Sequence, residues 1–172
     1  MPIPNFANGC LRKGWNSISR FAALKADIDQ EVRNLERLLC EMNEIFSTTQ
    51  EGSTARVRAA GSILHDFYTG VERIFRQIGV RIDQDLPREE DWHIQLLHRM
   101  AVPVEGIRPR VIDEKLEAEL EEYLRFCHLF RNIYGFELKW DRCQPLVENL
   151  DRVFSDLKEQ IDKFESFLSS IG

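Results

Sequence analysis

The eight residues CHLFRNIY, positions 127–134, concentrate side chains that can do chemistry. They include a thiol (Cys127), an imidazole for proton transfer (His128), a guanidinium that can bind phosphate (Arg131) and a phenol (Tyr134). On a helix, Cys127 and His128 would point about 100° apart, so they form no ready nucleophile–base pair. The residue that most needs an explanation is Arg131, because helical spacing places it among apolar residues.

Arg131 falls between Leu120 and Leu124 when each residue advances about 100° around a helix. A guanidinium in an apolar stripe is costly unless a carboxylate, a carbonyl or a phosphate meets it. Two interpretations are open. Arg131 either pairs with a buried acid or lies at a subunit interface, or it binds phosphate beside Tyr134. Spacing alone does not decide between them.

Helices must position these residues, because apolar residues recur at steps of three and four and no segment has the period of a strand. We predict helices over about residues 17–46, 54–78, 89–100, 113–134 and 145–168, the third being short. The turn-prone stretch STTQEGS separates the first two, and proline-containing loops flank the third. Gly135 can end the fourth helix through a positive φ. The predicted fold is an all-α bundle of four long helices and one short helix.

Length and composition indicate one globular domain over residues 1–172, with residues 1–16 extended or poorly ordered. The net charge of −6 argues against binding nucleic acid through the overall field, so any such contact needs a local basic patch. The sequence has no apolar run of about 20 residues, no secretory signal at its start and no CxxC pair among its four cysteines. We therefore expect a cytoplasmic protein with reduced thiols and no membrane contact.

Motifs for cofactors are absent from the sequence. It contains neither GxGxxG nor a GK[ST] phosphate loop. His93 and His98 lie five residues apart, about 140° round a helix, which is wrong for two metal ligands on one face. We therefore expect no cofactor and no metal ion.

The run DWHIQLLHRMAVPVEGIRPRVIDEKLEAELEEYLRFCHLFRNIYGFELKW, residues 91–140, resembles the HepT-like ribonuclease toxins of prokaryotic toxin–antitoxin pairs. These toxins belong to the HEPN superfamily of helical bundles, and the resemblance covers roughly residues 50–170. It implies a HEPN-like fold and a homodimer whose subunits form a cleft. It also implies an RNA substrate, cleavage without a metal ion and a partner nucleotidyltransferase that acts as the antitoxin.

The hallmark of HepT toxins is an arginine, four residues, a histidine, one residue and then a tyrosine. Alignment on Tyr134 puts Asn132 where that histidine belongs and Cys127 where that arginine belongs. Relatives of this branch read FRH..RN.Y, so Asn132 is regular for the branch, whereas Cys127 stands for a lost arginine. His128, Arg131 and Tyr134 remain, and the motif is incomplete.

The resemblance assigns chemistry to these candidates. Cleavage of RNA without a metal needs a base for the ribose 2′-hydroxyl and a cation that holds the phosphate. Arg131 would be the phosphate-binding group and His128 the proton-transfer group, with Asn132 and Cys127 at the motif positions. Tyr134 would accept AMP from the antitoxin, which would block the cleft by charge and bulk. The alternative for Tyr134 is a packed aromatic ring with a satisfied hydroxyl.

Three further arginines, Arg108, Arg110 and Arg125, could extend a basic patch toward RNA, and a solvated loop is the alternative for the first two. The absence of an arginine at position 127 favours a second overall interpretation. In that interpretation the chain is a non-catalytic HEPN-type helical module that binds RNA or a protein partner.

Overall fold

The structure is a computed structural model that describes residues 10–88 and 91–171, with side chains from residue 21 onward. In these ranges the chain forms five α-helices: α1 (Cys10–Thr48), α2 (Thr54–Ile78), α3 (Trp92–Ala101), α4 (Glu114–Asn132) and α5 (Trp140–Ile171). A π-helical turn, Gly79–Asp83, extends α2, and the described ranges contain an isolated bridge between Val104 and Arg108 but no strand. The prediction of four long helices and one short helix is confirmed.

Three helix boundaries differ from those predicted. α1 begins at Cys10, so residues 10–16 are helical where we expected an extended or poorly ordered segment, and residues 1–9 lie outside the described residues. α5 begins at Trp140 and contains Pro145 within it. α4 ends at Asn132, because Ile133 adopts an extended backbone (φ −118°, ψ 154°), and Gly135 is not among the glycines with positive φ. Tyr134 therefore lies in a loop after the helix.

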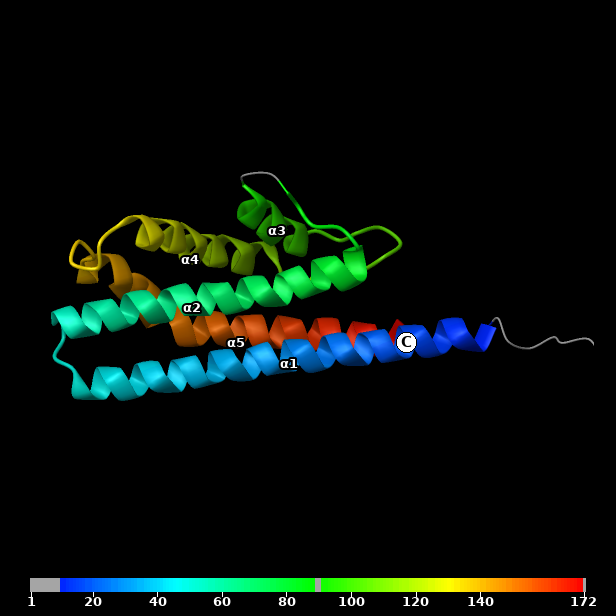
Figure 1. Cartoon of the computed structure of the whole chain (residues 1–172), viewed down its shortest axis with the longest axis horizontal. Helices are drawn as coiled ribbons and strands as arrows, with labels where there is room; N and C mark the ends of the chain where they lie inside the picture. The colour runs from blue at the N-terminus through cyan, green and yellow to red at the C-terminus, as the bar shows by residue number, and fades with distance from the viewer. Residues whose placement is uncertain (1–9, 89–90, 172) are drawn as a thin grey trace, which may run out of the picture.

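Helix α2 is the centre of the bundle and contacts each of the other four helices. α1 runs antiparallel to α2, α5 lies along both, and α3 and α4 cover the other side of α2 (Figure 1). The loop from α4 to α5, which carries Tyr134, lies at the same end of the bundle as the α1–α2 turn (Figure 1). This loop approaches α2 directly, because a Cβ built on Gly135 would lie 3.5 Å from Nε of Arg58.

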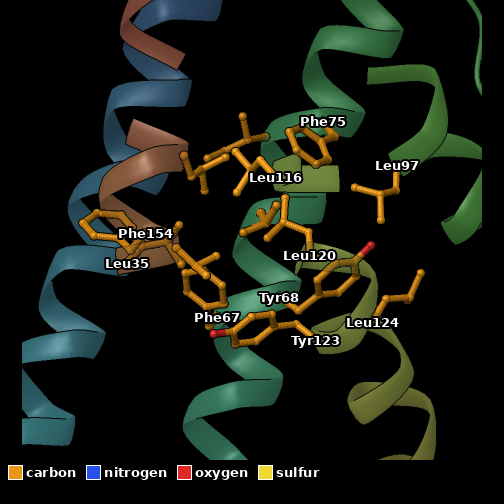
Figure 2. Packing of buried hydrophobic residues seen from close by; sticks show 14 of the residues in the cluster. Leu35, Phe67, Tyr68, Phe75, Leu97, Leu116, Leu120, Tyr123, Leu124 and Phe154 are labelled. Carbon is orange, nitrogen blue, oxygen red and sulfur yellow. The ribbon is translucent and has the colours of Figure 1, made fainter. Parts of the chain in front are cut away.

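The core lies where α2 meets its neighbours, and its side chains come from all five helices (Figure 2). Apolar residues of α2 and α4 interdigitate there with residues of α1, α3 and α5, including Leu35, Phe67, Phe75, Leu97, Leu116, Leu120, Tyr123, Leu124 and Phe154. Burying a side chain of this size contributes roughly 1.5–3 kcal/mol. The hydroxyl of Tyr123 donates to the Leu146 carbonyl at 2.8 Å, so its burial leaves that polar group satisfied. The apolar arc of α4 is thus used inside its own bundle.

Local signals set the starts of the two helices that build the site. Ser53 precedes α2 and accepts a hydrogen bond from the Arg56 amide, while Asp113 precedes α4 and accepts one from the Leu116 amide at 2.8 Å. Both are N-cap residues that satisfy amide groups left without a partner inside the helix. Of the helices in the described ranges, none combines the length and apolar character that a membrane crossing requires.

Candidate functional site

The last two turns of α4 carry the side chains that the sequence singled out, and they divide between the surface and the core. His128, Arg131 and Asn132 are exposed, whereas Cys127 is buried with 1% of its surface accessible. The helix turns the first three away from the packed interface with α2. The four candidates therefore do not form one constellation.

Arg131 is not buried in the apolar stripe, contrary to its helical spacing. It lies in the last turn of α4, where its Nε donates to Nε2 of His65 at 3.3 Å. The other ring nitrogen of His65, Nδ1, lies 3.3 Å from the Asp66 carboxylate. The guanidinium thus rests against an imidazole at the surface rather than against a buried acid, and its charge is available to an anion.

His128 faces a histidine from another helix. Its ring lies edge-on to that of His93 on α3, with centroids 5.5 Å apart and planes at 76°. Burial, followed by the neighbouring His93 and Arg131, lowers the pKa of His128 below its ordinary 6.5, and Glu72 opposes this shift. A histidine whose pKa is lowered is unprotonated at neutral pH, which is the state that a general base requires.

His93 is held by a buried carboxylate that the sequence analysis overlooked. Glu72, on the inner face of α2, is 9% exposed, and its Oε1 hydrogen-bonds with Nδ1 of His93. The His93 ring also stacks on Trp92 with centroids 3.7 Å apart. The exposed Arg76 lies with its guanidinium carbon 5.5 Å from the Trp92 ring centroid. The signal available in the sequence was a glutamate among the apolar residues of α2, one residue after Val71 and three before Phe75.

We define the histidine cluster as Glu72, His65, His93, His128 and Arg131. Its members come from α2, α3 and α4. His128 and Arg131 are three residues apart on one face of α4, and the others are at least seven residues from one another along the chain. Together they offer imidazoles for proton transfer, a carboxylate that orients one of them and a cation for an anionic group. This set matches what metal-independent phosphodiester chemistry needs.

Cys127 contributes no charge and no nucleophile to the cluster. Its Sγ points at the backbone of α2, 4.0 Å from the Leu64 carbonyl oxygen and 3.9 Å from that of His65. Burial raises the pKa of the thiol to about 12, although the nearby Arg131 acts in the opposite direction. Because the thiolate is the reactive form, Cys127 is an inert packing residue.

Asn132 also has a structural contact. Its Nδ2 donates to the His128 carbonyl at 2.7 Å, one turn earlier in α4. This bond adds a side-chain donor to a carbonyl in the last turns of the helix. An amide does not exchange protons at neutral pH, so Asn132 can hold the end of the helix but cannot replace the proton-transfer role of a histidine.

Tyr134 is 72% exposed in the loop after α4, so a packed ring is excluded. Its ring is nearly parallel to that of Phe136, with centroids 5.3 Å apart and planes at 6°. Its backbone amide donates to the Glu137 carboxylate at 2.9 Å. The phenol is therefore accessible to a second protein.

The three candidate RNA-binding arginines are not brought together. Arg108 is buried, and its guanidinium is occupied by Asp83 and three backbone carbonyls, so it offers no donor to RNA. Arg110 is exposed beside a groove of about 440 Å³ between the α3–α4 loop and α5. Arg125 is exposed, but Glu121 and Glu122 each accept a bond from it at 2.7 Å. Arg108 therefore leaves the set of RNA-contact candidates.

Within residues 10–88 and 91–171, no group of three or more histidine, cysteine, aspartate or glutamate side chains is arranged to hold a metal ion. A groove of about 620 Å³ lies between α4 and α5 and is lined by Arg125 and Arg152, among others. It contains no member of the histidine cluster, which lies on a more open surface.

Comparison with known proteins adds one finding. A family model described as HepT-like protein matches residues 59–168 of this chain. The match begins in the first turns of α2 and runs almost to the end of α5, so it includes the whole histidine cluster and the loop with Tyr134. Searches of curated proteins and of solved structures found no significant match.

Proposed function

Because the chain belongs to the HepT-like family, a HEPN helical-bundle family of toxin type, we propose that it is the toxin of a toxin–antitoxin pair and cleaves RNA without a metal ion. Family membership suggests the pairing with an antitoxin. The cleavage chemistry is supported by the placement of the exposed Arg131 three residues after His128, whose pKa is lowered by burial, on one face at the end of α4. Arg131 binds the phosphate, and His128 takes the proton of the 2′-hydroxyl.

The proposed antitoxin is a nucleotidyltransferase that silences the toxin by modifying Tyr134. The phenol oxygen attacks the α-phosphorus of ATP, loses its proton and releases pyrophosphate, which leaves AMP on the ring. The exposure of Tyr134 supports this step, because a buried phenol would need local unfolding to reach another enzyme's active site. The adduct adds negative charge and bulk near Arg131 and so opposes the binding of RNA phosphate.

The test is expression of the chain alone and together with a candidate nucleotidyltransferase. Alone, it should be weakly toxic at most, since Cys127 stands where the motif has an arginine, and should produce cut cellular RNA. Co-expression should add AMP-sized mass increments that disappear in Tyr134→Phe. Peptide mapping assigns the site without ambiguity, since the chain has three tyrosines and the other two, Tyr68 and Tyr123, are buried. Increments that persist in Tyr134→Phe, or that never appear, would contradict this mode of silencing.

A second candidate function is a non-catalytic helical module that binds RNA or a protein. The observation in its favour is Cys127, an uncharged buried thiol at the position where the HepT motif has an arginine. The two functions differ in one measurement. Purified chain that shifts RNA in a gel but leaves it intact over hours would favour the binding module.

We also propose a homodimer, through a surface other than the apolar arc of α4. The apolar arc of α4 packs against its own bundle and is not available to a second subunit. Leu129 and Phe136 remain exposed near the end of α4 and are apolar side chains available to a second subunit. Light scattering at micromolar concentration should give the mass of a dimer, and a monomer mass would count against a cleft shared by two subunits.

A further inference from the structure

Glu72 is a charged side chain in a place where charge is expensive. It projects from the inner face of α2, its side chain is 12% exposed, and its Oε1 bonds to Nδ1 of His93, whose side chain is 16% exposed. A buried ion pair is weak evidence for stability, because an apolar pair of similar volume often stabilises a fold as well or better. The presence of this largely buried pair within the histidine cluster therefore calls for an explanation other than stability.

The pair also fixes the state of the His93 ring. The contact with Glu72 makes Nδ1 the nitrogen that donates to the carboxylate, which leaves Nε2 to exchange a proton. Stacking on Trp92 at 3.7 Å restricts rotation of the ring. Another histidine of α3 shows the contrast: His98 also contacts a glutamate, Glu117 at 2.9 Å, but its side chain is 69% exposed and belongs to no cluster.

The oriented His93 ring faces His128 across the space between α3 and α4. Their centroids are 5.5 Å apart, and Arg131 follows His128 by three residues on the same face of α4. Cleavage of RNA involves two proton transfers at one phosphate, one from the attacking hydroxyl and one to the leaving oxygen. Two imidazoles at this separation, beside a guanidinium, can take the proton from the attacking oxygen and give one to the leaving oxygen of the same phosphate.

We propose that His93 is a catalytic residue of this site, that Glu72 positions it, and that His93 and His128 form the proton-transfer pair for RNA cleavage. This inference rests on the proposed ribonuclease function. His128 accepts the proton of the 2′-hydroxyl, and the 2′-oxygen forms a bond to the adjacent phosphorus while Arg131 binds the non-bridging oxygens. The bond from phosphorus to the 5′-oxygen breaks, and that oxygen takes a proton from the His93 imidazolium, which Glu72 stabilises. The products are a 2′,3′-cyclic phosphate and a 5′-hydroxyl end.

These roles give the cleavage rate a bell-shaped dependence on pH. The rate rises as the base, His128, loses its proton, and it falls once the general acid no longer carries one. The charged and titratable groups around His128 come from all the packed elements: Glu72 from α2, Asp91 and His93 from the start of α3, and Arg131 from α4 itself. The base of the pair gives the acidic limb, and the general acid gives the alkaline limb.

The test uses the full chain and total RNA from the expression host. The variant His93→Asn keeps an N–H donor for Glu72 but cannot transfer a proton, and it should slow cleavage by about 10²–10⁴-fold. It should also lose the alkaline limb of the pH profile. Glu72→Gln keeps the hydrogen bond without the negative charge, so it should move the alkaline limb to lower pH. His98→Asn is the matched control on the same helix and should cleave within about twofold of wild type, well short of the factors that proton transfer supplies.

Three results would overturn the inference. If His93→Asn cleaves at the wild-type rate with both limbs intact, His93 is not a catalytic residue, while the ribonuclease function stands. If His93→Asn is unfolded at the assay temperature, Glu72→Gln decides, and an unmoved alkaline limb rejects the pair. If wild type leaves RNA uncut, the proposed function itself fails, and the proton-transfer pair fails with it.

Discussion

Replacement of Arg108 by alanine tests whether this arginine holds the fold together or contacts RNA. Both Arg108 and Asp83 have side chains with no exposed surface, and they are joined by two bonds, Nε to Oδ1 at 2.6 Å and Nη2 to Oδ2 at 2.9 Å. Arg108 also donates to the carbonyls of Val102 at 3.2 Å, Pro109 at 3.1 Å and Arg99 at 3.0 Å. It thereby ties the α3–α4 loop to α3 and to the end of α2.

Removing the guanidinium leaves Asp83 as a buried carboxylate whose remaining cation is Arg99, with Nε at 3.1 Å. Breaking a buried pair by deleting one partner costs about 3–5 kcal/mol. Because Arg99 still meets the carboxylate, we expect the lower end, about 3 kcal/mol, for Arg108→Ala. In a domain of this size that loss lowers Tm by about 6–12 °C. Arg110→Ala, two residues away and exposed, should change stability by less than about 0.5 kcal/mol.

Urea unfolding followed by circular dichroism measures the stability of both variants, provided that the slope of unfolding free energy against urea concentration is the same as in wild type. The double variant Asp83→Leu/Arg108→Met fills the space with apolar groups and should recover most of the lost stability. Binding of RNA by the folded Arg108→Ala variant should keep the wild-type salt dependence, because a buried arginine releases no counterions. A structural role for Arg108 is refuted if Arg108→Ala loses no more stability than Arg110→Ala. It is also refuted if Arg108→Ala weakens the dependence of RNA affinity on salt concentration.

Three further outcomes follow from the packing and the charges. Cys127→Arg should lower the free energy of unfolding, because it puts a charged guanidinium where a buried thiol packs against the backbone of α2. Cys127→Ala should cost far less, and equal stabilities of the two variants in urea unfolding would contradict this. Burial raises the pKa of Glu165 from 4.5 to about 7, so its contribution to stability is complete below pH 4.5 and is lost as the pH rises through 7. Glu165→Gln should therefore stabilise the fold at pH 8 by about 1 kcal/mol, after allowance for solvent screening of a partly exposed group. At pH 4 the same substitution should not stabilise the fold. Thermal unfolding of wild type and variant at the two pH values measures both differences. In Gly61→Ala the new Cβ would lie 2.6 Å from atoms of both Leu138 and Phe130. Overpacking should therefore outweigh the gain in helix propensity and lower the free energy of unfolding, measured in urea, by about 1 kcal/mol net. A variant more stable than wild type would show that the two side chains move aside at little cost.

The periodicity of apolar residues was sufficient to predict the five helices and the inner faces of α2, α4 and α5. The same signal was misleading at the end of α4. It placed Arg131 in the apolar stripe, and it continued the helix to Tyr134, although the chain leaves the helix at Ile133. Periodicity describes the direction in which a side chain points, but it does not say whether a neighbouring helix covers that position.

The residues around the site show what the sequence by itself determined. Local sequence places His128 and Arg131 on one face, because three residues make almost one helical turn. It also shows Tyr134 near Gly135, at a position where a helix can end. The resemblance to HepT toxins was carried by these local spacings, and the family match over residues 59–168 agrees with it.

Tertiary structure alone decided the partners of these side chains. Glu72 meets His93 across 21 positions of sequence, Arg131 meets His65 across 66, and Arg108 meets Asp83 across 25. No periodic signal links such positions, since each contact depends on how whole helices and loops pack. The same packing buries Cys127 and Arg108 while it exposes Tyr134, because accessibility belongs to the assembled bundle and not to any single helix.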